Sequence, residues 1–267
     1  MPTLVKAALL GIIQGLTEFL PVSSTAHLLI SERLVGFQDL GGAFTVMIQL
    51  GSILAVMWLY RHKIAAVVAG LPSEPEARRF AFMVVLATVP ALVAGGLFSN
   101  YVKSVLYANF IVIALAFIIG GVVILVAEKR RPKPDVFEVD SLPVRRAFAI
   151  GTWQALALVP GVSRSGGTIV AGMLMRVDRA AAAEFTFFLA MPTMAAAFAH
   201  DLFQARHDLA SARGLEIAVG FVMAVLASAL VVKPFLDYVR RSGFAPFAWY
   251  RIGLGAVLLL ALAAGWV

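Results

Sequence analysis

The stretch that most strongly determines the fold is residues 108–127, which read ANFIVIALAFIIGGVVILVA. It contains no charged residue, and about 20 apolar residues in a helix span the hydrocarbon core of a bilayer. Further stretches of the same character are Phe44–Tyr60, Phe80–Phe98, Phe185–Ala199, Leu215–Val232 and Phe247–Trp266. Together with Ala108–Ala127, they predict an all-α polytopic membrane protein with six transmembrane helices.

The composition of the whole chain agrees with this prediction. Of its 267 residues, 61% are hydrophobic and 14% are charged, whereas soluble proteins have about 45–50% and about 25%. The net charge of +7 indicates basic loops at a cytoplasmic membrane face rather than binding of nucleic acid. Because the chain has no cysteine, disulfides and thiolate metal sites are excluded.

Two other apolar stretches are interrupted by polar residues. Leu4–Leu34 is broken by Pro21–Thr25 (PVSST), and Phe148–Met175 is broken by Pro160–Thr168 (PGVSRSGGT). Irregular backbone at membrane depth is tolerated only where protein buries it or water reaches it. We therefore predict that both stretches are re-entrant helical hairpins.

The two halves of the chain also resemble each other. Gly11–Gln14 (GIIQ) recurs as Gly151–Gln154 (GTWQ), and other short matches follow in the same order at similar spacing. Each half then holds one hairpin and three crossings, so the second half enters from the opposite face. This predicts one membrane domain, 1–267, built as an inverted-topology repeat of approximately 1–135 and 140–267.

The distribution of basic residues predicts the orientation. With six crossings, one face carries most of the lysines and arginines and should be cytoplasmic. The other face carries only Lys6, Arg33, Lys103, Arg206 and Arg213. Both termini and the entrance of the first hairpin would then lie outside, and the active site would open on the periplasmic side.

Topology leaves two charges unexplained, Glu18 and Arg164, one in each hairpin. An ionisable residue at membrane depth usually marks a functional site and has a partner. Gln14 shares a helix face with Glu18, so the two could hold a divalent cation through oxygen atoms, or Glu18 could act as a base. The alternative is a buried ion pair that only fastens the hairpins together.

The first break is rich in hydroxyl groups beside a histidine. Ser23, Ser24 and Thr25 are followed closely by His27. If a helix starts after the proline, one turn separates Ser24 from His27 and a hydrogen bond between them could activate the serine as a nucleophile. The alternative is that these hydroxyls cap the returning helix.

The second break has the composition of an anion site. Small residues at a helix start let backbone N–H groups face an anion, and a guanidinium suits phosphate. The candidate binding residues around Arg164 are Gly161, Ser163, Ser165, Gly166 and Thr168. The alternative is a tight hairpin turn, which by itself requires no arginine.

These two motifs together resemble a known family. Glu18–His27 (EFLPVSSTAH), with Gln14 upstream, and Pro160–Thr168 closely resemble the signatures of the bacterial undecaprenyl-diphosphate phosphatases, the integral-membrane bacitracin-resistance family. Val46–Ala55 adds to the likeness, which runs along essentially the whole chain. The family's acidic motif allows Glu or Gln at its first position. Gln14 occupies that position here, so Glu18 would carry the negative charge alone.

The resemblance implies a role for each matching residue. Glu18 and Gln14 would hold Mg²⁺ or Ca²⁺, Ser24 would be the nucleophile, and His27 its activator or an acid/base. Residues implied to bind the diphosphate, together with the small and hydroxyl residues beside them, are Ser23, Thr25, Gly161, Ser163, Arg164, Ser165, Gly166 and Thr168. The substrate would be undecaprenyl diphosphate, and the products undecaprenyl phosphate and inorganic phosphate.

The expected setting is the bacterial cytoplasmic (inner) membrane. There the reaction would recycle the lipid carrier of cell-wall synthesis and confer resistance to bacitracin. The expected partners are the lipid substrate and membrane lipid, with a homodimer as an additional candidate and no nucleic acid. The main alternative is a prenyl-lipid transporter or flippase, because inverted repeats are common in transporters.

Overall fold

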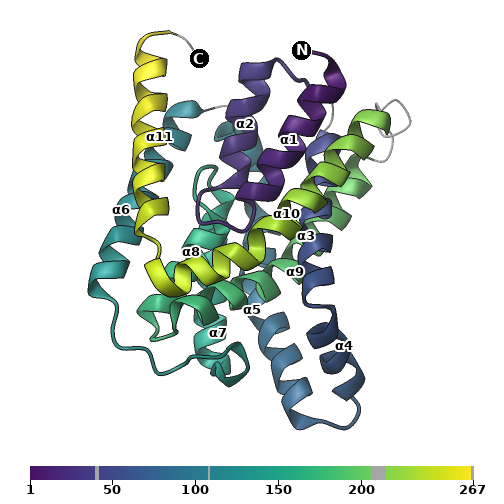
Figure 1. Ribbon diagram of the computed structural model, residues 1–267, viewed down its shortest axis with the longest axis vertical. Helices are drawn as coiled ribbons and strands as arrows, with labels where there is room; N and C mark the ends of the chain where they lie inside the picture. Colours follow the sequence, from purple (N-terminus) through teal and green to yellow (C-terminus); the bar gives the residue numbers. More distant parts are fainter. Residues whose placement is uncertain (40–41, 108, 206–213, 266–267) are drawn as a thin grey trace.

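The computed structural model describes residues 1–39, 42–107, 109–205 and 214–265, and the described chain is almost entirely helical (Figure 1). The long helices are α1 (Thr3–Thr17), α2 (Ser24–Val35), α3 (Ala43–Leu59), α4 (Arg61–Gly70), α5 (Pro75–Val105), α6 (Phe110–Arg130), α7 (Val144–Gln154), α8 (Arg164–Leu174), α9 (Arg179–Ala205), α10 (Gly214–Ser242) and α11 (Ala245–Ala263). Two short 3₁₀ helices, η2 (Val139–Ser141) and η3 (Ala155–Leu158), flank α7.

The expected crossings coincide with long apolar helices. Among the described residues, α5, α6, α9, α10 and α11 are long and apolar enough to span a membrane. The expected crossing Phe44–Tyr60 is α3, which meets α4 at a bend of 73°, and counting this bent pair as one span raises the total to six. Some residues used in the predictions of the crossings and of the orientation lie outside the described part of the chain. They are Ala108, Arg206, Arg213, Trp266 and the side chain of Lys103.

Outward faces of these helices are apolar. Leu97 is 71% exposed, Leu230 74% and Leu260 70%. Exposed side chains of this kind are stable against lipid, so this surface is that of a multi-pass membrane protein.

Glycines allow the helices to approach one another closely. Gly11 and Gly15 of α1 pack against the backbone of α10, where an added Cβ would collide with the carbonyl oxygens of Gly220 and Ala224. On the other side of the molecule, Gly121 of α6 packs in the same way on the carbonyl of Ala248 in α11. Small residues at such crossings let backbones pack within van der Waals contact, which drives helix association in lipid.

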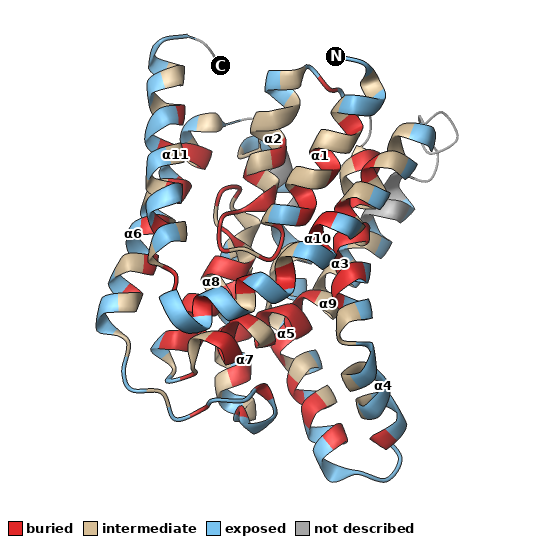
Figure 2. Ribbon diagram, viewed as in Figure 1, coloured by how far each residue is buried: buried red, intermediate tan, exposed pale blue. Residues whose placement is uncertain are grey.

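The buried residues gather where the two breaks lie, at the centre of the molecule (Figure 2). Phe19, directly after α1, is fully buried, with its ring 5.3 Å from that of Phe187 in α9 in an edge-on contact. Both breaks occur close to where the sequence predicts them, since α2 begins at Ser24 and α8 begins at Arg164. The packing thus fixes both irregular segments rather than leaving them on the surface.

Candidate functional site

Glu18 is the centre of the site. This residue follows the last turn of α1, and its side chain is 6% exposed. One carboxylate oxygen, Oε1, accepts a hydrogen bond from Arg164 Nη2 at 2.8 Å. The other, Oε2, accepts from Gln14 Nε2 at 2.8 Å and from Ser24 Oγ at 2.6 Å. The carboxylate therefore joins the two breaks and holds the Ser24 hydroxyl.

Ser24 is presented by a strained turn. Ser23, the residue before α2, has φ 68°, a backbone conformation that side-chain-bearing residues rarely adopt. Its side chain makes no cap hydrogen bond to α2, so the capping alternative fails at this position. Strain of this kind persists only where surrounding contacts hold it, and it is concentrated at functional sites.

His27 does not contact Ser24 in the way that the spacing suggests. The His27 ring lies between the carbonyl of Ser23, 2.8 Å from Nδ1, and the hydroxyl of Tyr250, 2.7 Å from Nε2. Because a carbonyl oxygen only accepts, Nδ1 carries a proton and donates to Ser23. Both ring nitrogens are thus occupied, and Ser24 donates to Glu18 instead. The reason is local: as first residue of α2, Ser24 points back toward α1.

In the second break, the hydroxyl groups bond within the protein. Ser163 caps α8 by accepting from Gly166 N at 3.0 Å, and it also bonds to Ser165 Oγ at 2.9 Å. Thr168 Oγ1 lies 2.9 Å from the carbonyl of Arg164 and 2.8 Å from the hydroxyl of Thr186. Ser163, Ser165 and Thr168 are all buried. These contacts shape the turn that presents Arg164.

The two breaks are also joined through their backbones. Ser165 Oγ donates to the carbonyl of Leu20 at 2.6 Å. Gly161, with φ 90°, lies so close to α6 that an added Cβ would be 2.8 Å from the carbonyl oxygen of Ile113. Here glycine is required both by the backbone conformation and by the close approach.

Arg251 is a site-forming residue that sequence reasoning missed. Its side chain, on α11, is 1% exposed. Its guanidinium donates to the carbonyls of Pro21 at 3.1 Å and Gly161 at 2.9 Å, one in each break, and to those of Ala116 and Phe117 in α6. All four acceptors are neutral, so these contacts leave the positive charge in place. A charge inside the expected crossing Phe247–Trp266 was the signal that could have identified it.

A preformed cation site is only partly present. Both oxygens of Glu18 already accept hydrogen bonds, and the amide nitrogen of Gln14 faces the carboxylate. Gln14 Oε1, however, is buried and has no hydrogen-bond donor within the described structure. Among the described residues, no three His, Cys, Asp or Glu side chains are grouped for a metal ion. The oxygens of Glu18 and Gln14 fit a hard cation only if further oxygens come from elsewhere.

Comparison with known proteins identifies the family. The family model described as bacitracin resistance protein BacA matches residues 7–257. The chain belongs to this family. A relative from Cereibacter sphaeroides named undecaprenyl-diphosphatase is 49% identical over 265 residues, covering 99% of this chain and 98% of the relative.

Two further relatives match this chain along nearly their full length. Undecaprenyl-diphosphatase 1 of Agrobacterium fabrum is 46% identical over 260 residues, with 97% of each chain covered. Undecaprenyl-diphosphatase of Phenylobacterium zucineum is 47% identical over 263 residues, covering 98% of this chain and 99% of the relative. The resemblance inferred from the two motifs is thereby confirmed, and the segments that carry it lie within the matched residues.

Proposed function

We propose that this membrane protein hydrolyses undecaprenyl diphosphate to undecaprenyl phosphate and inorganic phosphate. The observation that carries the proposal is the Ser24–Glu18–Arg164 cluster, in which a hydroxyl donates to a carboxylate that also binds a guanidinium. The names of the full-length relatives support the same reaction. The enzyme is a hydrolase that recycles the lipid carrier of cell-wall synthesis, and its activity confers bacitracin resistance.

The proposed chemistry has two steps. Ser24 Oγ forms a bond to the terminal phosphorus while the bond from that phosphorus to the bridging oxygen breaks, which releases undecaprenyl phosphate. The proton of Ser24 passes to Glu18 Oε2, its hydrogen-bond acceptor at 2.6 Å. Water then attacks the phosphoserine, inorganic phosphate leaves, and Glu18 returns the proton to Ser24.

Positive charge in the site favours the anionic substrate. Arg164 follows the N-cap of α8, where backbone N–H groups and the helix dipole also attract phosphate. The buried, positively charged guanidinium of Arg251 contacts the backbone of both breaks and adds to the positive charge near the site. Ser23, Thr25 and the residues around Arg164 would complete the diphosphate site. Such preorganised charge is usually the largest contribution to catalysis of this type.

His27 has a positioning role in this proposal. Its Nδ1–H holds the carbonyl of Ser23, the residue with the strained backbone, and so fixes the turn that delivers Ser24. A His27→Asn variant tests this role, because an amide can donate to the same carbonyl. It should keep much of the kcat that His27→Ala loses, whereas equal loss in both variants would indicate an acid/base role.

We further propose that Glu18 and Gln14 bind Mg²⁺ or Ca²⁺ together with diphosphate oxygens. Support comes from the buried, donor-free Gln14 Oε1 and from the preference of these cations for oxygen ligands. A bound cation would neutralise the diphosphate charge. Terbium luminescence in the presence of a non-hydrolysable diphosphate should show cation binding in the wild type and at least ten-fold weaker binding in Gln14→Leu.

An inverted repeat of re-entrant hairpins is the arrangement that we propose for these elements. In its support, α1 packs on α10 as α7 packs on α5, with Gly11 and Gly151 each against a backbone carbonyl. The start of α1 and the end of α11 lie at the same side of the molecule (Figure 1). We place this side in the periplasm, with the active site open to it.

Cysteine labelling tests this orientation in a chain that has no cysteine of its own. A membrane-impermeant maleimide should react from the periplasm with Arg33→Cys and from the cytoplasm with Arg241→Cys, both at exposed positions. The reverse pattern would invert the proposed topology.

Chemical crosslinking between copies in the membrane would test the homodimer, which stays a prediction.

Phosphate release by purified protein in detergent tests the activity. The wild type should release phosphate from C55 diphosphate, and Glu18→Gln should lose at least 10³-fold in kcat. Without release, but with movement of the lipid across vesicle membranes, the protein would be a flippase.

The Ser24→Ala variant tests the attacking atom. It should lose activity by at least 10³-fold, since removing a nucleophile commonly has effects of this size. Rapid quenching of the wild type should also capture a phosphoserine. Near-normal turnover by Ser24→Ala would show that water attacks phosphorus directly.

A further inference from the structure

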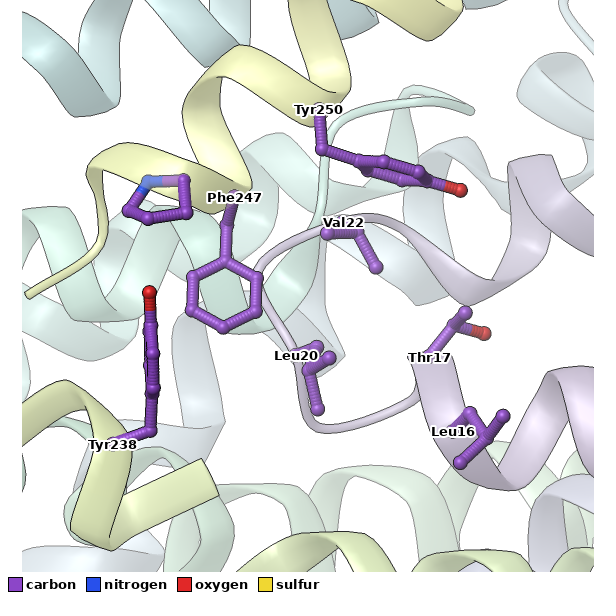
Figure 3. A pocket seen from close by; sticks show the side chains of 8 residues that line it. Leu16, Thr17, Leu20, Val22, Tyr238, Phe247 and Tyr250 are labelled. Atoms are coloured by element: carbon purple, nitrogen blue, oxygen red, sulfur yellow. The ribbon is translucent and has the colours of Figure 1, made fainter. Parts of the chain in front are cut away.

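Tyr250 is a polar side chain beside the candidate site that takes no part in the bond making and breaking proposed above. It lies on α11, and its hydroxyl is 2.7 Å from His27 Nε2. The two rings are stacked, with their centroids 5.6 Å apart and their planes 7° apart. Figure 3 shows the ring of Tyr250 extending from α11 beside Val22, on the loop that leads to Ser23. The tyrosine therefore contacts the histidine that holds the strained turn.

The direction of each hydrogen bond around His27 follows from its partner. Nδ1 carries a proton because it faces the carbonyl oxygen of Ser23, which can only accept. In a neutral imidazole the other nitrogen is then a bare acceptor, so Tyr250 donates its hydroxyl proton to Nε2. The hydrogen bond at one ring nitrogen determines which nitrogen carries the proton. Tyr250 thus favours the Nδ1–H form of the ring.

The surroundings of His27 favour a neutral imidazole. Its ring meets that of Phe117 edge-on, with the centroids 5.5 Å apart. The guanidinium of Arg251 lies 5.7 Å from the centre of the same Phe117 ring. A second positive charge in this place would be repelled by the first. Because a neutral ring donates from only one nitrogen, the choice between Nδ1–H and Nε2–H decides whether Ser23 is held.

α11 gives the tyrosine a fixed position. Gly121 of α6 packs on the carbonyl of Ala248, and Gly255 of α11 packs on the carbonyl of Ala114 in α6. An added Cβ would lie 2.6 Å from the first carbonyl oxygen and 2.7 Å from the second. These two close approaches lie on either side of Tyr250 along the helix. Backbones packed at this distance hold the two helices together in lipid.

We propose that Tyr250 is a positioning residue, whose hydroxyl keeps His27 in the form that binds the carbonyl of Ser23. Its effect on the reaction rests on the proposed function, in which the turn at Ser23 presents Ser24 as the nucleophile. Without the hydroxyl, the ring can adopt the Nε2–H form. Nδ1 would then turn a lone pair toward the carbonyl oxygen, and the two would repel each other. Only the backbone N–H of His27, at 3.2 Å from the same oxygen, would remain to hold the turn.

Tyr250→Phe tests the proposal because it removes the hydroxyl and keeps the ring. We expect kcat to fall about ten-fold, with little change in KM, since Ser24 is less well placed. The matched control is Tyr238→Phe. Tyr238 borders the same pocket (Figure 3), is 41% exposed against 49% for Tyr250, and packs its ring on Phe247. This control should keep the wild-type kcat, and equal kcat in the two variants would overturn the proposal.

A double variant separates an effect on His27 from an effect on packing. The amide of asparagine has one fixed donor group and no second tautomer. In a His27→Asn background, Tyr250→Phe should therefore lower kcat by at most about two-fold, because the two substitutions act on one interaction. A further ten-fold loss in that background would show that the hydroxyl acts by another route, and the proposal would fail.

Nitrogen NMR measures the form of His27 without any need for hydrolysis. The chain has four histidines, and the signal of His27 is the one that disappears in His27→Asn. Nδ1 should carry the proton in the wild type and in Tyr238→Phe, whereas Tyr250→Phe should shift toward the Nε2–H form. The same form in all of these proteins would overturn the proposal. The expected shift in a protein that releases no phosphate would refute the proposed hydrolysis and keep the effect of Tyr250 on His27.

Discussion

The two breaks differ in how their hydroxyl groups are used. In the second break, Ser163 caps α8 in the ordinary way, and Thr168 bonds to neighbouring backbone and to Thr186. In the first break, Ser23 adopts a strained backbone without capping α2, and Ser24 donates to a carboxylate. The second break is therefore a stabilised support for Arg164, whereas the first holds in place the hydroxyl that we propose as the nucleophile.

The difference means that the hydroxyl groups of the second break contribute mainly to stability, whereas Ser24 in the first break contributes to the proposed chemistry. A satisfied cap stabilises its helix, because the hydroxyl accepts a hydrogen bond from a free backbone N–H group. A strained turn costs free energy that the surrounding contacts must offset, and here the contacts of His27 and Arg251 hold the first break. The order of effects expected from substitutions follows from this contrast.

The largest effect should come from separating the charges that join the breaks. Arg164→Ala leaves Glu18 as a buried carboxylate without its ionic partner, which should destabilise the protein by about 3–5 kcal/mol and abolish activity. The double variant Arg164→Ala/Glu18→Gln should regain stability, because it no longer buries an unpaired carboxylate, but it should not regain activity. Unfolding in detergent and phosphate release measure the two effects.

The control for this experiment is an ion pair at the surface. Arg146 contacts Asp135 at 2.5 Å, and both side chains are about one-third exposed. Arg146→Ala should cost only about 0–1 kcal/mol and leave activity intact. If it is as harmful as Arg164→Ala, the special importance of the buried pair is refuted.

The next largest effect should come from displacing Arg251, whose guanidinium bonds to the backbone of both breaks. In Gly120→Ala, the added methyl would collide with the guanidinium of Arg251 and displace it from Pro21 and Gly161. A shift of about 1 Å in a catalytic group can cost about 10²-fold in rate. We expect kcat to fall by about 10²-fold with a smaller change in KM.

Gly253→Ala serves as the matched control on α11, because an added Cβ there meets nothing within 4 Å. It should retain wild-type kcat. Arg251→Lys should recover part of the activity lost in Arg251→Met, since an ammonium can still reach some of the carbonyls. Equal activity in Gly120→Ala and Gly253→Ala would show that Arg251 does not position the breaks.

A smaller effect compares the same substitution before each returning helix. Ser163→Ala removes the cap of α8 and should lower the free energy of unfolding by about 1 kcal/mol. Ser23→Ala removes no cap and should change it by much less. Unfolding of both variants in detergent provides the comparison. Similar losses would mean that Ser23 stabilises α2 through a contact other than a cap.

The smallest effect is expected at Asp135, in the loop between α6 and η2. Asp135 contacts Arg146 and Arg176, and the hydrogen bond from Arg146 holds the pKa of the Asp135 carboxyl below its usual range. Its stabilising contribution is therefore present above the ordinary pKa of about 4 and disappears as pH falls through the lowered value. Asp135→Asn should lower the unfolding temperature slightly at pH 7 and not at strongly acidic pH. A difference that persists in acid would point to another cause.

Much of the architecture could be predicted from the sequence. Long apolar runs specify spanning helices because backbone groups in lipid must bond within their own segment. The breaks were equally clear, because proline, glycine and hydroxyl residues interrupt otherwise apolar runs. The bend between α3 and α4 was not predicted. Arg61, His62 and Lys63 mark the end of the expected crossing at Tyr60, but they do not show in which direction the chain continues.

The details of the site were less predictable. Sequence spacing suggested a bond between Ser24 and His27, but spacing along one helix does not reveal partners on other helices. Tyr250, 223 positions away, takes one nitrogen of His27, and Glu18 takes the hydroxyl of Ser24. Arg251 was overlooked because its acceptors are backbone carbonyls, which any sequence provides.

The sequence by itself determined a helical membrane protein with two polar breaks and the residue types of a phosphatase in them. The helices and the breaks follow from local composition, which sets where a chain can cross lipid and where it cannot. The phosphatase assignment follows from the resemblance of the two motifs to a known family. Only the tertiary structure decided which hydroxyl meets Glu18, which ones cap or brace α8, and which arginine holds both breaks. These are contacts between distant segments, and they are fixed by helix packing at glycine crossings rather than by any short run of residues.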